Sequence, residues 1–155
     1  MNIVLIISII FTIVFLTITA LIIMRKDQRE HETQFLEVNK NRAIVNLYAS
    51  NTKINGIEVN RLNSIKSING QRIVALETCI HTFEGRFFAI DTKFADCKTE
   101  KIKFSIELQN GCIYTLGLYF SPPEQFDNAP SAIFALTIDV VGINTNAYVI
   151  CYQEN

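Results

Sequence analysis

The residues best suited to chemistry in this 155-residue chain are its cysteines and histidines. They are Cys79, Cys97, Cys112, Cys151, His31 and His81. No two cysteines form a C-x-x-C pair, whereas a zinc site needs closely spaced ligand pairs. Cys79-x-His81 alone is too small a ligand set, and no spacing indicates a thiol nucleophile with a histidine base. We therefore expect no metal and no cofactor.

The four cysteines have two further interpretations. An even number in a small domain is typical of two disulfides, with three connectivities to choose from. The alternative is four buried free thiols, because cysteine is among the most buried residue types. We predict disulfides among these four residues.

Other chemistry is missing as well. The sequence has no G-x-S-x-G, no H-E-x-x-H and no phosphate-binding glycine loop. Asp139 is an isolated carboxylate in an apolar segment, and its alternation with Ile138 and Val140 indicates a position on a solvent-facing or interface side of the strand. The balance of 14 basic and 15 acidic residues leaves no electrostatic footprint for nucleic acid. We expect a protein that is not an enzyme and does not bind nucleic acid.

An apolar run near the N-terminus determines where such a protein would work. Ile3 to Met24 contains no charged side chain, and at about 1.5 Å per residue a helix of this length spans roughly 33 Å. Only Met1 and Asn2 precede the run, and no pair of small residues marks a cleavage site at its end. We therefore predict an uncleaved single-pass membrane anchor over residues 1–24, rather than a cleaved signal.

The sequence signals that indicate which side of the membrane the domain faces disagree with one another. Arg25, Lys26 and Arg29 follow the run directly, which by the positive-inside rule places the remainder of the chain in the cytoplasm. The chain also lacks any N-x-Ser/Thr sequon, as expected of a domain that never enters the secretory lumen. The cysteine count instead favours an oxidising environment. The three basic residues are also candidates for contact with anionic lipid headgroups.

The remainder divides into two parts. Residues 25–41 are charged and rich in helix formers, so we expect a helical stalk whose Phe35, Leu36 and Val38 dock onto the domain. Residues 42–155 have the length of one domain. The segment from Arg42 to Ala49 is either its first strand or the end of the stalk.

The domain has the pattern of an antiparallel β fold. Lys101 to Leu108 alternates polar and apolar residues, and the almost wholly apolar Ser131 to Val141 predicts a central strand. Turn dipeptides lie between apolar runs, at Asn55-Gly56, Asn69-Gly70, Glu84-Gly85 and Asn110-Gly111. Apolar residues every third position from Val59 to Ile68 predict one short helix. The expected fold class is α+β: a transmembrane helix with a helical stalk, then a mostly antiparallel β domain with disulfides.

Three aromatic residues are candidates for an interface. Phe87 and Tyr119 fall on the predicted wet faces of strands. Phe126 lies in a polar loop that contains all three prolines. For Phe126 the alternative is a side chain that folds back into the core.

The anchor, its basic flank and a small domain with paired cysteines resemble the N-terminally anchored envelope proteins of large DNA viruses. Those proteins include the per os infectivity factors of baculoviruses and the proteins through which poxviruses enter and fuse with host cells. The resemblance implies a subunit of a multi-protein complex for viral attachment or penetration. In such viruses a thiol oxidase forms disulfides in domains that face the cytoplasm.

The arrangement is also similar to a type IV pilin, with its apolar N-terminal helix, antiparallel sheet and C-terminal disulfide. It departs from that pattern because no basic leader with a glycine cleavage site precedes the run, and Leu5 stands where bacterial pilins have Glu. We predict an anchored subunit of a virion envelope or cell-surface complex that binds other anchored subunits, with a pilin-like filament subunit as the alternative. A membrane-tethered receptor for a small ligand is a third class.

Overall fold

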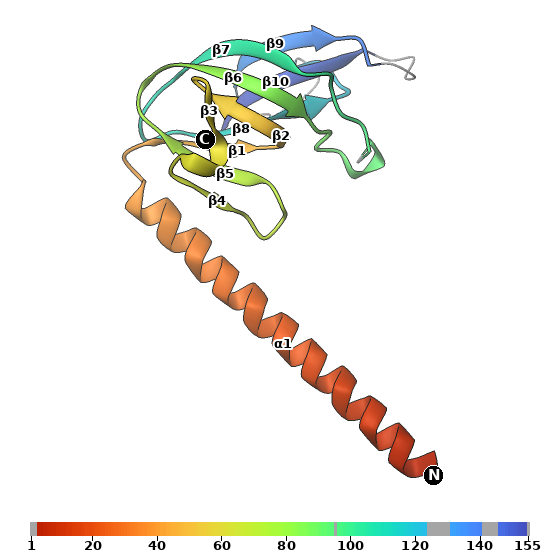
Figure 1. The fold of residues 1–155 in the computed structure, drawn as a ribbon. Coiled ribbons are helices and arrows are strands. Elements are labelled where there is room, and N and C mark those ends of the chain that lie inside the picture. Colours follow the sequence, from red (N-terminus) through yellow and green to blue (C-terminus); the bar gives the residue numbers. More distant parts are fainter. Residues whose placement is uncertain (1–2, 95, 124–130, 141–145, 155) are drawn as a thin grey trace.

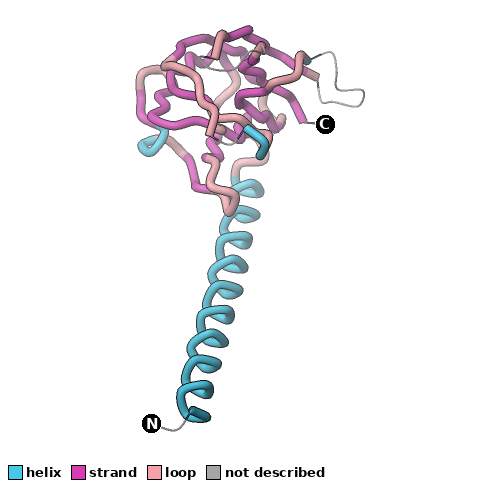
Figure 2. The backbone as a smooth tube through the Cα atoms, turned by 90° about the vertical axis from the view of Figure 1, so that its right-hand side faces the viewer, coloured by secondary structure: helices cyan, strands magenta, loops and turns pink. Residues whose placement is uncertain are grey.

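The computed structural model describes residues 3–94, 96–123, 131–140 and 146–154. One long helix projects from a β sandwich (Figures 1 and 2). The helix is α1 (Ile3–Val38). The strands are β1 (Ala43–Leu47), β2 (Ala49–Ile54), β3 (Ile57–Glu58), β4 (Ser64–Lys66), β5 (Arg72–Leu76), β6 (Cys79–Phe87), β7 (Ile102–Leu108), β8 (Ile113–Tyr119), β9 (Ala132–Ile138) and β10 (Ala147–Glu154), with short 3₁₀ turns at Val59–Arg61 and Thr92–Phe94.

Helix α1 continues without a break from the apolar run through the charged stalk. Its segment Ile6–Val38 is long and apolar enough to cross a membrane, and none of its most apolar part is buried against the described residues. The hydroxyls of Thr12, Thr17 and Thr19 donate to backbone carbonyls three or four residues earlier. These threonines are therefore satisfied within the helix, as an apolar surrounding requires.

The strands form two sheets that pack face to face. Sheet A has the order β4-β5-β1-β8-β10-β9, and sheet B has the order β3-β2-β6-β7. All pairs of named strands are antiparallel except β1 with β8, which run parallel. The expected α+β class with a mostly antiparallel domain is thus confirmed, and Arg42 to Ala49 supplies the first strand.

The core lies between the two sheets. Fully buried side chains come from both of them, among them Leu47, Leu116 and Val149 from sheet A and Phe83 and Leu108 from sheet B. Alternation along each strand sends every second side chain into this layer. The two sheets therefore share one main core, and a smaller apolar cluster lies on the outer face of sheet A.

Turns are present at three of the four glycines for which the sequence predicts them. Gly56, Gly70 and Gly111 have φ of 80°, 88° and 74°, the left-handed region that favours glycine. Gly85 instead lies in the middle of β6, so the turn predicted at this position is wrong. A Cβ at Gly85 would lie 2.9 Å from Thr52 Oγ1, so glycine serves close strand packing here.

The short helix predicted between Val59 and Ile68 is also wrong. A 3₁₀ turn at Val59–Arg61 is followed by strand β4 (Ser64–Lys66). Ser64 Oγ donates to the carbonyl of Val59 at 2.8 Å and ties the two together. Val59 enters the core and Leu62 packs against it, so these residues are buried without a helical period.

The end of α1 docks onto the outer face of sheet A. Phe35 and Leu36 pack against Ile44, Ile73 and Ala75 of β1 and β5, which confirms the docking predicted for these two residues. Val38 is 81% exposed, so the docking predicted for it is wrong. A second set of contacts is polar: the Glu32 carboxylate accepts from Ser67 Oγ at 3.0 Å and from the Ile68 N–H at 3.4 Å. Asn63 Nδ2 donates to Asn39 Oδ1 at 2.7 Å. The helix therefore meets the domain through packing and hydrogen bonds together.

Candidate interaction site

Strand β9 is one edge of sheet A, at the opposite end from the other edge strand, β4, and from the strands that contact α1. It pairs with β10 on one side, and its other side faces no strand of the described chain. Its sequence, AIFALTI, has no charged residue, and Ile133 and Leu136 are 39% and 37% exposed. The prediction of a central strand at Ser131 to Val141 is therefore wrong, although its apolar composition is that of a buried strand.

Strand β7 is the corresponding edge of sheet B, and it differs in chemistry. Lys103, Ser105 and Glu107 alternate with apolar residues and point to solvent. Charged residues, lysine above all, are a common device against unwanted pairing at sheet edges. The two edges lie close together in Figure 1, and the rings of Phe104 and Phe134 stack across them at 4.6 Å between centroids.

The three predicted interface aromatics have different outcomes. Phe87 is fully buried in the core, and its ring tilts against that of Phe104. The prediction that it lies on a wet face is therefore wrong. Buried and more exposed residues alternate along β6, and Phe87 falls on the buried side. Tyr119 lies partly buried on the outer face of sheet A, edge-on to Tyr152 at 5.2 Å. Burial raises the pKa of its phenol. Phe126 lies outside the described residues.

Tyr119 shares its face with β9. It pairs with Tyr148 across β8 and β10, and Tyr148 in turn pairs with Thr137 of β9. Directly opposed residues in antiparallel strands project to the same side. Tyr119 therefore belongs to the row of side chains that ends at the free edge.

The predicted disulfides are not formed. All four cysteines fall in the described part of the chain, and each is a free thiol. Cys151 is opposite Leu116, and Cys112 precedes Leu116 by four residues, which is about 13 Å along a strand. Bridged cysteines need Cα atoms within about 7 Å. Cys151 is instead buried in the core, which raises the pKa of its thiol to about 12.

Cys79 and His81 are brought together with Asn55, a set that resembles a nucleophile, a base and an orienting amide. Cys79 Sγ lies 3.2 Å from His81 Nε2, and Asn55 Nδ2 lies 3.1 Å from His81 Nδ1. Asn55 Oδ1 accepts the Thr82 N–H, so the amide nitrogen must be the group that faces Nδ1. His81 Nε2 is also 2.8 Å from the carbonyl of Glu77, which can only accept.

Both ends of the imidazole therefore require the same tautomer. Nδ1 is the acceptor, and Nε2 carries the proton and donates it to Glu77. A general base for Cys79 would need an unprotonated nitrogen facing the thiol. The ring thus functions as a buried connector between the β2–β3 turn and the start of β6, and not as a base.

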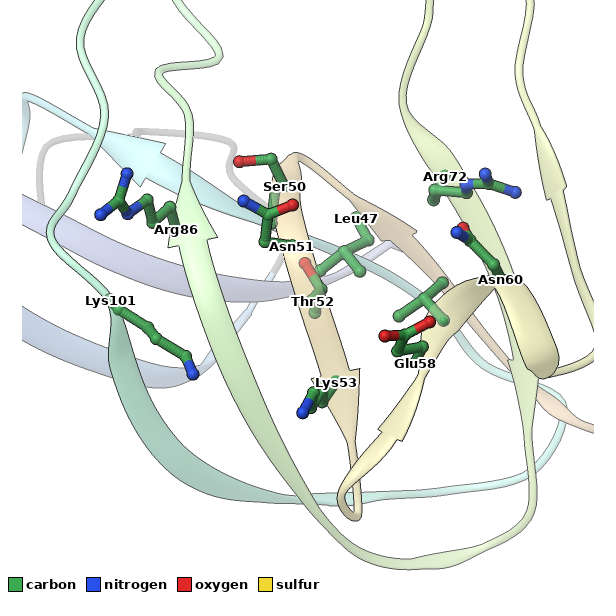
Figure 3. Close-up of a pocket in the computed structure, with 12 residues that line it drawn as sticks. Leu47, Ser50, Asn51, Thr52, Lys53, Glu58, Asn60, Arg72, Arg86 and Lys101 are labelled. Carbon is green, nitrogen blue, oxygen red and sulfur yellow. The ribbon is translucent and has the colours of Figure 1, made fainter.

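A groove of about 680 Å³ lies beside β2 and is lined from both sheets. Figure 3 shows Arg86 and Lys101 on one side of β2, and Arg72 and Asn60 on the other. Asn51, at the centre, has φ of 50° within an irregular stretch of the β2–β6 pairing. Such bulges re-aim side chains and are frequent at binding sites.

Sequence reasoning missed this groove. Its basic residues lie in β2, in β5, near the end of β6 and just before β7, and they meet only through the order of the strands. The irregular pairing at Asn51 has no sequence signal beyond the tolerance of asparagine for positive φ. Neither property forms a motif.

The three basic residues that follow the apolar run are exposed, as the predicted contact with headgroups requires. Arg25, Lys26 and Arg29 lie on α1 one to five residues beyond Met24. Lys26 makes a salt bridge of 3.8 Å with Glu30 one turn later, and such exposed pairs contribute about 0.3–0.5 kcal/mol. The three side chains therefore remain available to phosphate groups.

Comparison with protein-family models, with curated proteins and with solved structures finds no match to this chain.

Proposed function

We propose that this protein is a non-enzymatic, single-pass membrane-anchored subunit of a surface or envelope complex, and that its β domain takes a strand of another anchored subunit at the edge of β9. The observation that carries the proposal is the composition of β9. It is a seven-residue edge without a charge, whereas the neighbouring edge β7 carries lysine and glutamate.

An edge strand supplies two kinds of complementarity. Its outward N–H and C=O groups bind a partner backbone, and its alternate side chains select the partner residues. Ile133, Ala135 and Thr137 project from one face of β9, next to the row that ends in Tyr119. A strand added here would extend sheet A and cover the exposed apolar atoms. The partner segment expected to pair with β9 is therefore an apolar strand.

Anchoring supports the same proposal. The contact of Glu32 with the β4–β5 turn lies eight residues beyond Met24, about 12 Å along the helix axis. The domain is thus held close to the bilayer, where other anchored chains are concentrated. Restricting two partners to one surface raises the effective concentration of each for the other.

The absence of a base for Cys79 supports a non-catalytic role. The proton on His81 Nε2 removes the one thiol–imidazole pair in the described chain from nucleophilic chemistry. A pilin-like filament is the second candidate, since it would use the apolar helix as its polymer core. In that case α1, and not β9, would make the main contact between subunits.

Site-specific photocrosslinking in native membranes tests the proposal. A photoreactive residue at Ala135 of β9 should form an adduct with a second anchored chain, and one at Ser105 of β7 should not. Adducts that form from residue 14 in the apolar helix, with none from Ala135, would contradict the β9 interface and favour the filament. Mass spectrometry of the adduct identifies the partner.

A further inference from the structure

The groove beside β2 holds more positive charge than its own acidic residues balance. Lys101 makes a salt bridge with Glu84, and Glu58 lies 4.0 Å from Arg61 at its margin. Lys53, Arg72 and Arg86 have no salt-bridge partner within the described part of the chain. Unbalanced charge of one sign in a concave site attracts ligands of the opposite sign.

Arg86 has acidic neighbours on its far side, and they do not neutralise it. Glu100 and Asp139 share a smaller cavity with Arg86, but neither lies within 4.0 Å of its guanidinium. The Arg86 side chain is exposed, and it lines the β2 groove together with Ser50 and Asn51. Its donors are therefore accessible from the groove.

The two arginines belong to different sheets. Arg72 opens β5 in sheet A, and Arg86 lies near the end of β6 in sheet B. Figure 3 places them on opposite sides of β2, with Asn51 between them. A guanidinium binds planar anions such as carboxylates through two parallel hydrogen bonds. The arrangement suits a ligand with two separated anionic groups rather than one.

The backbone of β2 offers a further set of contacts. Strand β3 pairs only with Lys53 and Ile54, so the stretch from Ala49 to Thr52 has no strand partner on that side in the described chain. Thr52 lines the groove, and its buried hydroxyl has no hydrogen-bond partner. Unpaired backbone and polar side chains favour a peptide over an apolar small molecule.

From these observations we propose that the β2 groove binds an extended acidic peptide segment, with carboxylates on Arg72 and Arg86 and its backbone along Ala49–Thr52. The site lies on a different strand from β9 and does not depend on the function proposed above. Lys53 adds charge at one end of the site. Gly85 maintains its shape, because a side chain there would press on Thr52 Oγ1 and on the carbonyl of Ser50.

Fluorescence anisotropy with the full chain in an uncharged detergent tests the proposal. The probes are a fluorescein-labelled octapeptide of alternating Glu and Ser, and a matched octapeptide of alternating Lys and Ser. The acidic probe should bind and the basic probe should not. The double variant R72Q/R86Q should weaken binding of the acidic probe at least tenfold, because both bidentate contacts are lost.

The matched control is K40Q/K93Q, which removes the same charge from exposed lysines outside the groove. It should change the affinity less than twofold. The single variant K53Q, with an intermediate loss of about threefold, provides a second test if R72Q/R86Q unfolds; circular dichroism checks folding. Equal losses in R72Q/R86Q and K40Q/K93Q would contradict the proposal, because binding would then follow net charge alone.

Two other results would also overturn it. The first is failure of the acidic probe to bind the unaltered protein at 50 mM NaCl. The second is displacement of the probe by inorganic sulfate far more readily than by chloride at equal ionic strength. That result would mean that the groove holds a single compact anion and not a peptide.

Discussion

Two seven-residue edge strands, β7 and β9, close the same side of the sandwich and differ in almost every chemical respect. In β7, Lys103 lies between the partly buried Ile102 and Phe104, and Glu107 lies between the buried Ile106 and Leu108. In β9, no residue is charged, and five of the seven are exposed. A lone chain gains nothing from an apolar edge in water, because such an edge promotes pairing with any available strand. We propose from this difference that β7 is adapted to solvent and β9 to a partner.

Charging β9 should have the largest effect. A135K/T137K places two lysines on the outward face of β9, where neither parent side chain enters the core. Desolvating them against an apolar partner should reduce association by at least 100-fold, about 2.7 kcal/mol. Quantitative recovery of the partner with the tagged chain from native membranes measures this. S105K/E107K in β7 is the control, and an equal loss there would remove the distinction between the two edges.

Removing the aromatic contact between β7 and β9 should have a slightly smaller effect than charging β9. Phe134 stacks on Phe104 and packs against the core while it is only partly buried. F134A should therefore lower the free energy of unfolding by about 2 kcal/mol, below the 3–5 kcal/mol of a fully buried phenylalanine. Urea denaturation of the variant measures it. Additive losses in F134A, F104A and the double variant would show that the two edges do not support each other.

Part of this contrast was predictable from the sequence. The alternation of Lys101 to Leu108 predicts β7 correctly, because one wet face and one dry face leave a clear period of two. The apolar run from Ser131 to Val141 predicts a strand, but it places that strand at the centre of the sheet. Apolar composition indicates that a strand is shielded from water, but it does not indicate whether the same chain or another chain shields it. This disagreement between the predicted and the observed burial of β9 is the observation behind the proposed interface.

Other errors have local physical causes. Gly85 has the same sequence surroundings as a turn glycine, but it is required by the approach of Thr52 from a neighbouring strand. The four cysteines have an even count, yet strand register keeps Cys112 and Cys151 apart. The β2 groove was not predictable, because its cations come from strands that are distant in the sequence.

High pH should weaken sheet A, which contains β9. Burial raises the pKa of Cys151 from 9.0 to about 12, so the folded state holds the thiol proton more tightly than the unfolded state does. This contribution to stability is complete below pH 9 and is lost as pH rises towards 12. It amounts to about 2 kcal/mol lost by pH 10.5. Denaturation from pH 8 to 10.5 measures it, and C151A should flatten the dependence; an unchanged slope in C151A would assign it to the tyrosines.

Converting β7 into a strand like β9 should have the smallest effect. K103V/E107V removes both charges from the exposed face of β7 while keeping a residue with high strand propensity. Self-association of the purified chain should rise about tenfold, which sedimentation velocity in detergent measures. A variant that stays monomeric would mean that charge is not what protects this edge.

Amide hydrogen exchange on the full chain in its native membrane tests the central claim most directly. If a partner strand covers β9, its amides should exchange as slowly as those of interior strand β10, and A135K/T137K should abolish that protection. Amides on the free side of β7 should exchange quickly in both proteins. Fast exchange throughout the free side of β9 in the native complex would contradict the account.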